Sequence, residues 1–320
     1  PNWGLEIGKW REESEKLYQS EWKEGSPKQM EVVIKTNLKT GLGNLSQFLR
    51  DINAKTVGEF VETAKDRVNY LEPGAGVSTI NVYQELERRN IDLEKIYSIL
   101  VEPSKEKLEN AVEELKKMGL KESKNFEARV GKDMDVKERE YFDLIAAVAT
   151  IHHHAYLDTP LKILYDALKK GGMIFIADWH NSMWEHPARV YEALKKDFEW
   201  EGKERDLKRF IEMYPKANEK PPDLEKEIDE QANLMIRRFW KAYGEIKAEE
   251  IEKGSFTRED DIIMLEGHRP VERQVEEMIK AGFSLETREI NELIERIGIK
   301  KNPHYLLPNS SLLAFTIGQK

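Results

Sequence analysis

The stretch that most constrains the fold is residues 68–78, which read VNYLEPGAGVS. An apolar run ends there in a carboxylate, and a turn that contains Gly74 and Gly76 follows directly. Glycine permits a tight turn and lets backbone N–H groups approach a ligand that a Cβ would exclude. A second apolar run, residues 99–102, also ends in a carboxylate. The pattern predicts two strands that end together at a ligand-binding edge.

Two kinds of cofactor use a glycine turn of this type. A dinucleotide needs the pattern GxGxxG because its pyrophosphate lies against a helix N-terminus, but the third position here is Thr79. Glu72, two residues before the first glycine, would also repel a pyrophosphate. A carboxylate at that position favours a cationic ligand, and Glu102 is placed to accept both hydroxyls of a ribose. The turn therefore predicts a nucleoside-containing cofactor that carries a positive charge.

The same turn resembles motif I of the class I methyltransferases, [DE]xGxGxG, with Ser78 in place of the third glycine. Further segments follow in the order of that family: an acidic loop, a motif IV strand, a glycine turn before a strand, and a closing pair introduced by AGF. They are residues 131–135, 141–154, 170–178, 281–288 and 311–316. The resemblance extends over residues 65–320 and implies methyl transfer from S-adenosylmethionine, with S-adenosylhomocysteine as the second product.

Strands and helices alternate from Arg67 to Ala177, a pattern typical of βαβ units and a parallel sheet. The resemblance implies an α/β fold with a seven-stranded, mostly parallel sheet flanked by helices. Its last two strands, at 281–288 and 311–316, would form an antiparallel pair. We expect four parts: a helical N-terminal segment (1–64), the cofactor-binding α/β core (65–185), a helical cap insertion (186–269) and the end of the core (270–320).

The insertion is the unusual part of this plan. Residues 186–269 read as helices that are interrupted at Tyr214-Pro215 and at Lys220–Asp223, where proline breaks a helix. The stretch Asp223–Glu250 carries apolar residues at helical spacing along one face. We expect these helices to cover the substrate end of the sheet.

Donor binding is implied by the resemblance residue by residue. Glu72, Gly74 and Gly76 would contact the methionine moiety, and Glu102 would bind the ribose. Around the adenine, Asp133 would face the exocyclic amine and Met134 would stack on the ring. The complete set of predicted cofactor-binding residues is Glu72, Gly74, Gly76, Ser78, Glu102, Pro103, Asp133, Met134 and Thr150.

Five of the seven histidines follow two neighbouring predicted strands: His152, His153, His154, His180 and His186. Ligands bind at the carboxyl ends of strands in open α/β sheets, and imidazole titrates near neutral pH. One of these histidines could therefore take a proton from the methyl acceptor. The predicted catalytic residues are His153, His154 and His180, and a packing or capping role is the alternative.

Asp178, His180 and Asn181 also offer nitrogen and oxygen ligands of the kind that metals use. No metal-ligand spacing such as HExxH occurs in the chain. We therefore expect no metal.

An aromatic acceptor site is the hypothesis for a group of large side chains after the same strands. Its members are Tyr156, Trp179, Trp184 and Arg237. Arg237 would pair with an acidic group of the substrate. The alternative is an arginine pair, Arg237-Arg238, that is solvated beside glutamates on a helix.

Composition limits the partners. The formal net charge is −9 and no long basic run occurs, so binding to nucleic acid is disfavoured. No apolar run reaches the roughly 18 residues of a membrane span. Cysteine is absent and lysine and glutamate dominate the charge, which favours a cytoplasmic, thermostable protein. The sequence leaves homo-oligomerisation open.

Mainly through this resemblance, we expect an S-adenosylmethionine-dependent methyltransferase that acts on a small molecule under a helical cap. An RNA or protein methyltransferase is the first alternative. A nucleoside-cofactor-binding protein without transferase activity, or a dehydrogenase on a similar fold, is the second, since a fold alone does not determine function.

Overall fold

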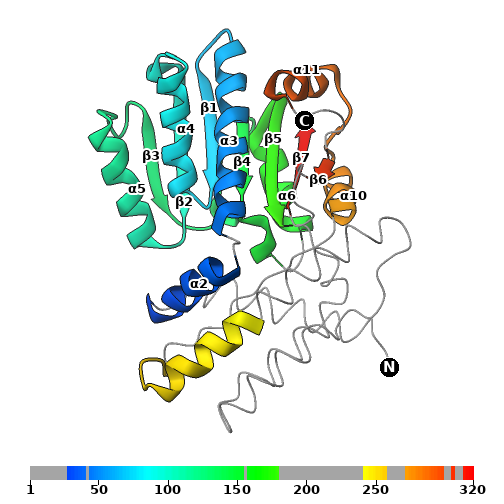
Figure 1. The fold of residues 1–320 in the computed structure, drawn as a ribbon. Coiled ribbons are helices and arrows are strands. Elements are labelled where there is room, and N and C mark those ends of the chain that lie inside the picture. Colours follow the sequence, from blue (N-terminus) through cyan, green and yellow to red (C-terminus); the bar gives the residue numbers. More distant parts are fainter. Residues whose placement is uncertain are drawn as a thin grey trace, which may run out of the picture.

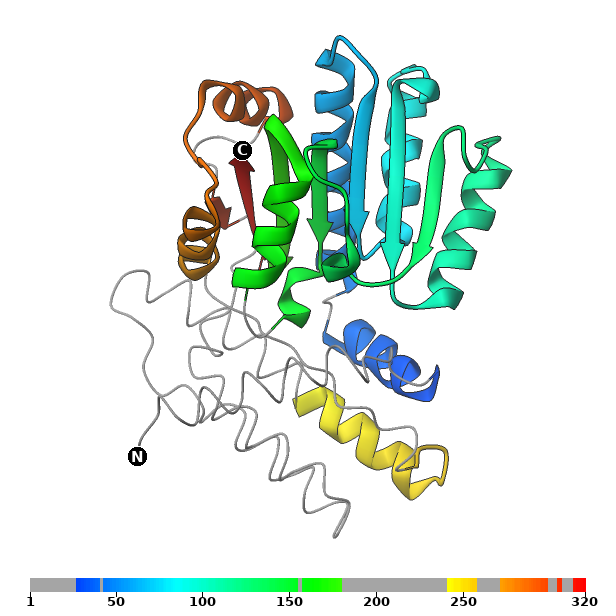
Figure 2. The same cartoon turned by 180° about the vertical axis from the view of Figure 1, so that it is seen from behind.

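The computed structural model describes residues 27–40, 43–154, 157–179, 241–257, 271–298, 304–306 and 313–320. A twisted sheet with helices on both faces forms the body of this part of the chain (Figures 1 and 2). Its strands are β1 (Val68–Pro73), β2 (Ile96–Glu102), β3 (Phe126–Val130), β4 (Phe142–Val148), β5 (Leu168–Trp179), β6 (His304–Leu306) and β7 (Leu313–Gln319). Among the described residues the sheet has seven strands, in the order β3-β2-β1-β4-β5-β7-β6.

The first five strands are parallel, as predicted. β1 lies between β2 and β4, β3 pairs with β2, and β5 pairs with β4, all in parallel register. β7 runs antiparallel to both β5 and β6. The α/β fold with a mostly parallel sheet is therefore confirmed, and the carboxyl ends of β1 to β5 lie along one edge.

All of the named helices except α2 pack on the sheet, in two layers. They are α2 (Pro27–Thr40), α3 (Gly43–Thr63), α4 (Val77–Arg88), α5 (Lys105–Lys117), α6 (Asp158–Ala167), α10 (Val271–Ala281) and α11 (Arg288–Ile297), with short 3-10 turns η1 (Leu93–Lys95), η2 (Asp133–Asp135) and η3 (Ile151–His153). One apolar core contains side chains of α3, α4, α5 and α11, and a second contains side chains of α6 and α10. Side chains that alternate along each strand enter opposite cores, as Tyr70 and Leu71 do.

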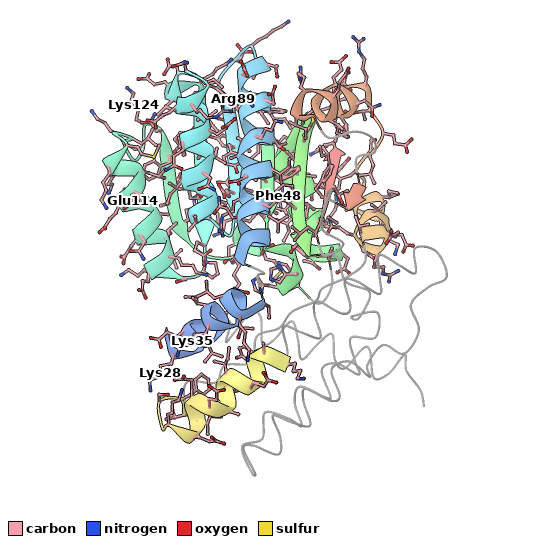
Figure 3. All side chains as sticks on the ribbon, in the orientation of Figure 1. Lys28, Lys35, Phe48, Arg89, Glu114 and Lys124 are labelled. Atoms are coloured by element: carbon pink, nitrogen blue, oxygen red, sulfur yellow. The ribbon has the colours of Figure 1, made fainter. Side chains whose placement is uncertain are left out.

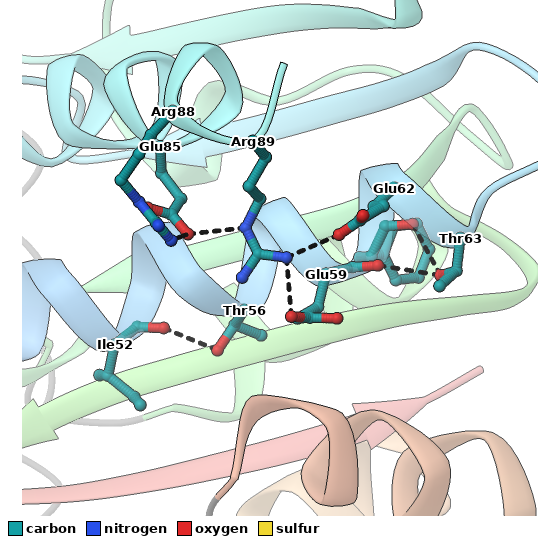
Figure 4. Close-up of polar contacts among 9 residues, drawn as sticks. Ile52, Thr56, Glu59, Glu62, Thr63, Glu85, Arg88 and Arg89 are labelled. Atoms are coloured by element: carbon teal, nitrogen blue, oxygen red, sulfur yellow. Dashed lines mark hydrogen bonds and ion pairs between the residues drawn. The ribbon is translucent and has the colours of Figure 1, made fainter. Parts of the chain in front are cut away.

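An arginine joins the first two helices of the main layer. The Arg89 guanidinium, just past the end of α4, donates to Glu59 and Glu62 of α3 at 2.7 Å each and to Glu85 of α4 at 2.6 Å (Figure 4). Only 12% of its side chain is exposed. This cluster fixes α3 against α4 at the edge opposite the glycine turn (Figure 3).

The predicted sixth strand, at residues 281–288, is wrong. This segment makes a single antiparallel bridge, between Ser284 and Gln319. The Thr287 hydroxyl then accepts a hydrogen bond from the backbone N–H of Ile290 and caps α11. Because α11 buries an apolar stripe that includes Ile290 and Ile294, the segment continues as a helix and β6 forms only at residue 304. The other predicted closing strand, at 311–316, is confirmed as β7 with its boundaries shifted.

In the described part of the chain, two helices lie beyond the carboxyl edge of the sheet. One is α2, and the other is formed by residues 241–252, the described part of the predicted 186–269 insertion (Figures 1 and 2). Lys35 of α2 pairs with Glu250 at 3.1 Å, and Lys39 pairs with Glu245 at 3.0 Å. The rest of the insertion and residues 1–26 lie outside the described residues.

Among the described residues, no helix is both long enough and apolar enough to cross a bilayer.

Candidate functional site

A buried carboxylate ends the first strand. Glu72 is fully buried, and its two oxygens accept hydrogen bonds from the hydroxyls of Ser78 and, at 3.1 Å, Tyr70. Burial raises the pKa of Glu72 to about 7, although its hydroxyl neighbours oppose the rise. No lysine, arginine or histidine in the described part of the chain forms an ion pair with it. A carboxylate buried in this way fits a ligand that brings its own positive charge.

The glycine turn that follows is tight. Gly74 has a φ of +74°, in the left-handed region, and a Cβ built on it would lie 2.2 Å from the Thr150 hydroxyl oxygen. That hydroxyl lies 3.2 Å from the carbonyl oxygen of Pro73 and 3.0 Å from that of Val148. The predicted cofactor residue Thr150 thus joins the end of β4 to the turn, and only glycine fits at position 74.

The second glycine faces open space. A Cβ added to Gly76 would meet nothing within 4 Å. Gly76 is also the N-cap of α4, and the backbone N–H groups at the start of a helix favour polar or anionic ligand groups. The turn therefore has room for a ligand at Gly76, which is what the predicted donor requires.

Glu102 occupies the matching place on the second strand. Pro73 of β1 is in register with Val101 of β2. Glu102 therefore lies at the level of Gly74, the residue that follows Pro73. It is 5% exposed, and the backbone N–H of Ser104 donates to it at 2.9 Å. Burial raises the pKa of Glu102 to about 7. A carboxylate fixed at this edge can accept two neighbouring hydroxyls of a sugar.

The structure pairs Asp133 with His154. The Nε2 atom of His154 lies 2.7 Å from one Asp133 oxygen, and the backbone N–H of Met134 donates to the other at 3.0 Å. Both side chains of the pair are buried. Three residues that the sequence placed in the site therefore meet, and His154 contacts a predicted adenine-binding carboxylate rather than open space.

A second histidine–aspartate pair was missed by the sequence analysis. The Nδ1 atom of His152 lies 2.8 Å from Asp178, whose other oxygen accepts the backbone N–H of His152 at 2.9 Å. The only sequence signal for this pair is that His152 follows β4 and Asp178 lies near the carboxyl end of the neighbouring strand, β5. His153 is partly exposed, and its ring packs against that of His152 with centroids 4.1 Å apart. The two pairs anchor the loop after β4 on both sides.

The chain enters this loop through a strained residue. Ala149 has a φ of +49°, which non-glycine residues rarely adopt, and its N–H donates to Ala177 of β5 at 2.8 Å. Such conformations are concentrated at functional sites.

Several predicted site residues lie outside the described part of the chain. They are Tyr156, His180, Trp184 and Arg237. Trp179 is the last residue of β5, and its side chain is not among those described. Within the described residues no group of three metal-binding side chains occurs.

Comparison with solved structures finds chains of low identity. One is a possible exported protein from Bordetella parapertussis (11% identity, TM-score 0.46, 84% of this chain and 66% of that chain covered). A second is a SAM-dependent methyltransferase from Aquifex aeolicus (12% identity, TM-score 0.39, 81% of this chain and 85% of that chain covered). A third is the YcgJ protein from Bacillus subtilis (16% identity, TM-score 0.36, 83% of this chain and 97% of that chain covered). Comparison with curated proteins finds no match.

The family itself is shown by a sequence model. The model described as a methyltransferase domain matches residues 64–235, which is more than half of the chain. The matched region begins just before β1 and includes Glu72, the glycine turn, Glu102 and both histidine–aspartate pairs. The chain therefore belongs to the class I methyltransferases, enzymes that use S-adenosylmethionine as the methyl donor.

Proposed function

We propose that this enzyme methylates a small molecule that binds between the carboxyl edge of the sheet and a helical cap. The observation that carries the proposal is the position of α2 and helix 241–252 beyond that edge (Figure 1). Two ion pairs, at 3.0 and 3.1 Å, join these helices to each other. A cap over the site would exclude water and limit the size of the acceptor. The net charge of −9 supports an acceptor other than nucleic acid.

The donor roles in this proposal are those that the resemblance implies, and the buried Glu72 and the open space at Gly76 support them. The sulfonium of the bound donor supplies an activated methyl group, and the enzyme orients it. Glu72 pairs with the ammonium group of the donor, and Glu102 accepts the ribose hydroxyls. Gly76 leaves room for the methionine end, and Pro103, Asp133 and Met134 surround the adenine.

The acceptor proton goes to a histidine in this proposal. His153 is the partly exposed histidine of the loop after β4, whereas His154 is buried against Asp133. His153 is therefore the better candidate for a general base, and His154 for a positioning role. His180 stays a candidate base from its sequence position.

The predicted acceptor site, cap, cellular compartment and heat stability are part of the same proposal. Tyr156, Trp179, Trp184 and Arg237 would line the acceptor site, and the insertion 186–269 would form the cap. The absence of cysteine and the abundance of lysine and glutamate favour a cytoplasmic, heat-stable enzyme.

Transfer of a radioactive methyl group tests the acceptor class. The enzyme is incubated with S-adenosylmethionine labelled in the methyl group and with a cell extract separated into dialysable, RNA and protein fractions. We expect label in the dialysable fraction. Label that is confined to RNA or protein would contradict the small-molecule proposal and would support the alternative acceptor.

A further inference from the structure

We propose that Asp178, near the end of β5, is a positioning residue for methyl transfer: it holds His152, and through His152 it fixes the ring of His153. The proposal rests on the role of His153 as general base, given above. Asp178 is a buried carboxylate to which the donor roles give no part.

Asp178 holds His152 at two points. One carboxylate oxygen lies 2.8 Å from the Nδ1 atom of His152, and the other accepts the backbone N–H of His152 at 2.9 Å. The two side chains are only 4% and 8% exposed. An ionised carboxylate can only accept a hydrogen bond, so Nδ1 of His152 carries a proton. The pair therefore fixes one orientation of the His152 ring and the backbone that carries it.

The strand that carries Asp178 is fixed on both sides. Asp178 is in register with Ala314 of β7, and the preceding residue, Ala177, is in register with the last residue of β4. The carbonyl oxygen of Ala177 accepts the N–H of Ala149 at 2.8 Å, and Ala149 has the strained φ of +49°. Strained backbone persists only where the surrounding structure holds it. Two consecutive residues of β5 thus hold the start of the loop after β4.

His153 lies against the ring that Asp178 anchors. The His152 and His153 rings have centroids 4.1 Å apart and planes inclined by 41°. His152 is buried, whereas His153 is partly exposed. A fixed ring in contact with an exposed one limits the rotamers that the exposed ring adopts. A general base must lie within hydrogen-bond reach of the proton that it takes, and a misplacement of about 1 Å can cost about 100-fold in rate.

The Asp178 pair lies on the side of β4 away from the donor residues. β4 has β5 on one side and β1, followed by β2, on the other. Glu72 and Glu102 end β1 and β2, and the other pair of the loop, His154 with Asp133, also contains a predicted donor residue. Loss of the Asp178 contact should therefore lower the rate of methyl transfer and leave the affinity for the donor unchanged.

A double-variant cycle on the full-length protein tests this role. The proteins are the wild type, Asp178→Asn, Asp178→Glu, His153→Gln, the double variant Asp178→Asn/His153→Gln and, as a charge-matched control, Asp166→Asn. Asp166 is a part-exposed carboxylate of α6 that pairs with Lys162 at 2.6 Å. The rate of transfer of a radioactive methyl group is measured at saturating S-adenosylmethionine, with the cell-extract fraction that the wild type labels as acceptor. Calorimetry gives the affinity for S-adenosylhomocysteine.

We expect Asp178→Asn to lower the rate by about tenfold or more while the affinity for S-adenosylhomocysteine changes by less than about twofold. Asp178→Glu should be more active than Asp178→Asn because it keeps the negative charge. In the His153→Gln background, Asp178→Asn should cause little further loss, since two residues that act through one contact are not additive. Asp166→Asn should match the wild type.

Three results would overturn the proposal. An unchanged rate in Asp178→Asn would show that the contact has no part in the reaction. Equal losses with and without His153 would show that Asp178 does not act through His153, and parallel losses of rate and affinity would show a structural role. Because the assay uses whichever fraction the wild type labels, a wrong acceptor class leaves this test intact. An unchanged rate in His153→Gln would overturn the base and this proposal together.

Discussion

The hydroxyl oxygen of Thr150 lies 2.2 Å from the point where a Cβ on Gly74 would stand. This relationship joins the turn after β1 to the loop after β4. It makes residue 74 intolerant of any side chain for a steric reason and for a backbone reason, because its φ is +74°. Gly76, two residues on, has open space instead.

The two glycines should therefore respond differently to alanine. Gly74→Ala should lower the free energy of unfolding by about 2 kcal/mol or more, through the clash and the left-handed backbone. Gly76→Ala should lower it less but should weaken S-adenosylhomocysteine, since the new methyl group fills space that the ligand needs. Denaturant unfolding and calorimetry measure the two effects. Adding Thr150→Ala should recover part of the Gly74→Ala loss, and no recovery would contradict the steric assignment.

Glu72 should make the stability of the ligand-free protein depend on pH. Its pKa is about 7 in the folded chain and 4.5 as the ordinary value. The folded state therefore keeps a proton that the unfolded state loses, and stability falls as pH rises from about 4.5 to about 7. The interval corresponds to about 3 kcal/mol.

Denaturant unfolding at pH 5 and pH 8 measures this effect. Glu72→Gln should be more stable than the wild type at pH 8 and should show a smaller decline between the two pH values. A residual decline is expected because burial also raises the pKa of Glu102. If Glu72→Gln leaves the pH dependence unchanged, the buried carboxylate does not carry the effect.

Glu102 should contribute to binding through the ribose. Glu102→Ala should weaken S-adenosylhomocysteine by about 1–3 kcal/mol because charge-assisted hydrogen bonds to two hydroxyls are lost. Glu106→Ala, an exposed carboxylate in the first turn of α5, is the control and should have no effect. Unchanged affinity of Glu102→Ala in calorimetry would remove the ribose assignment.

Arg89 should stabilise the fold more than its neighbour Arg88. Arg89→Met breaks three ion pairs to Glu59, Glu62 and Glu85 (Figure 4) and should cost about 1–2 kcal/mol of unfolding free energy. The Arg88 side chain is 69% exposed and pairs with Glu85 alone, so Arg88→Met should change stability by less than about 0.5 kcal/mol. Equal losses in the two variants would show that exposure does not decide the contribution.

The parallel core and its two strand-end carboxylates could be predicted because the signals are local. Apolar runs that end in Glu72 and Glu102 are visible in the sequence, and the glycine turn follows directly. The sixth strand was misplaced because the AGF resemblance outweighed a helix signal, the Thr287 cap and the apolar stripe of α11. For residues 288–297, the spacing of apolar residues predicts the secondary structure better than the resemblance does.

The pairings inside the site could not be predicted in the same way. His152 meets Asp178, and His154 meets Asp133, only because the sheet order brings β4 next to β5 and η2 close to the loop after β4. The burial of Asn53 has no sequence signal at all. A polar residue within a helical stripe is buried or exposed according to what the helix packs against.

The central claim is that Glu72 binds the positively charged end of the donor. Calorimetric titration of the wild type and Glu72→Gln with S-adenosylmethionine at pH 8, with NAD as the comparison ligand, tests it most directly. The account predicts that the wild type binds S-adenosylmethionine and not NAD, and that Glu72→Gln loses about tenfold or more in affinity. Equal affinity in the two proteins, or binding of NAD in place of S-adenosylmethionine, would contradict it.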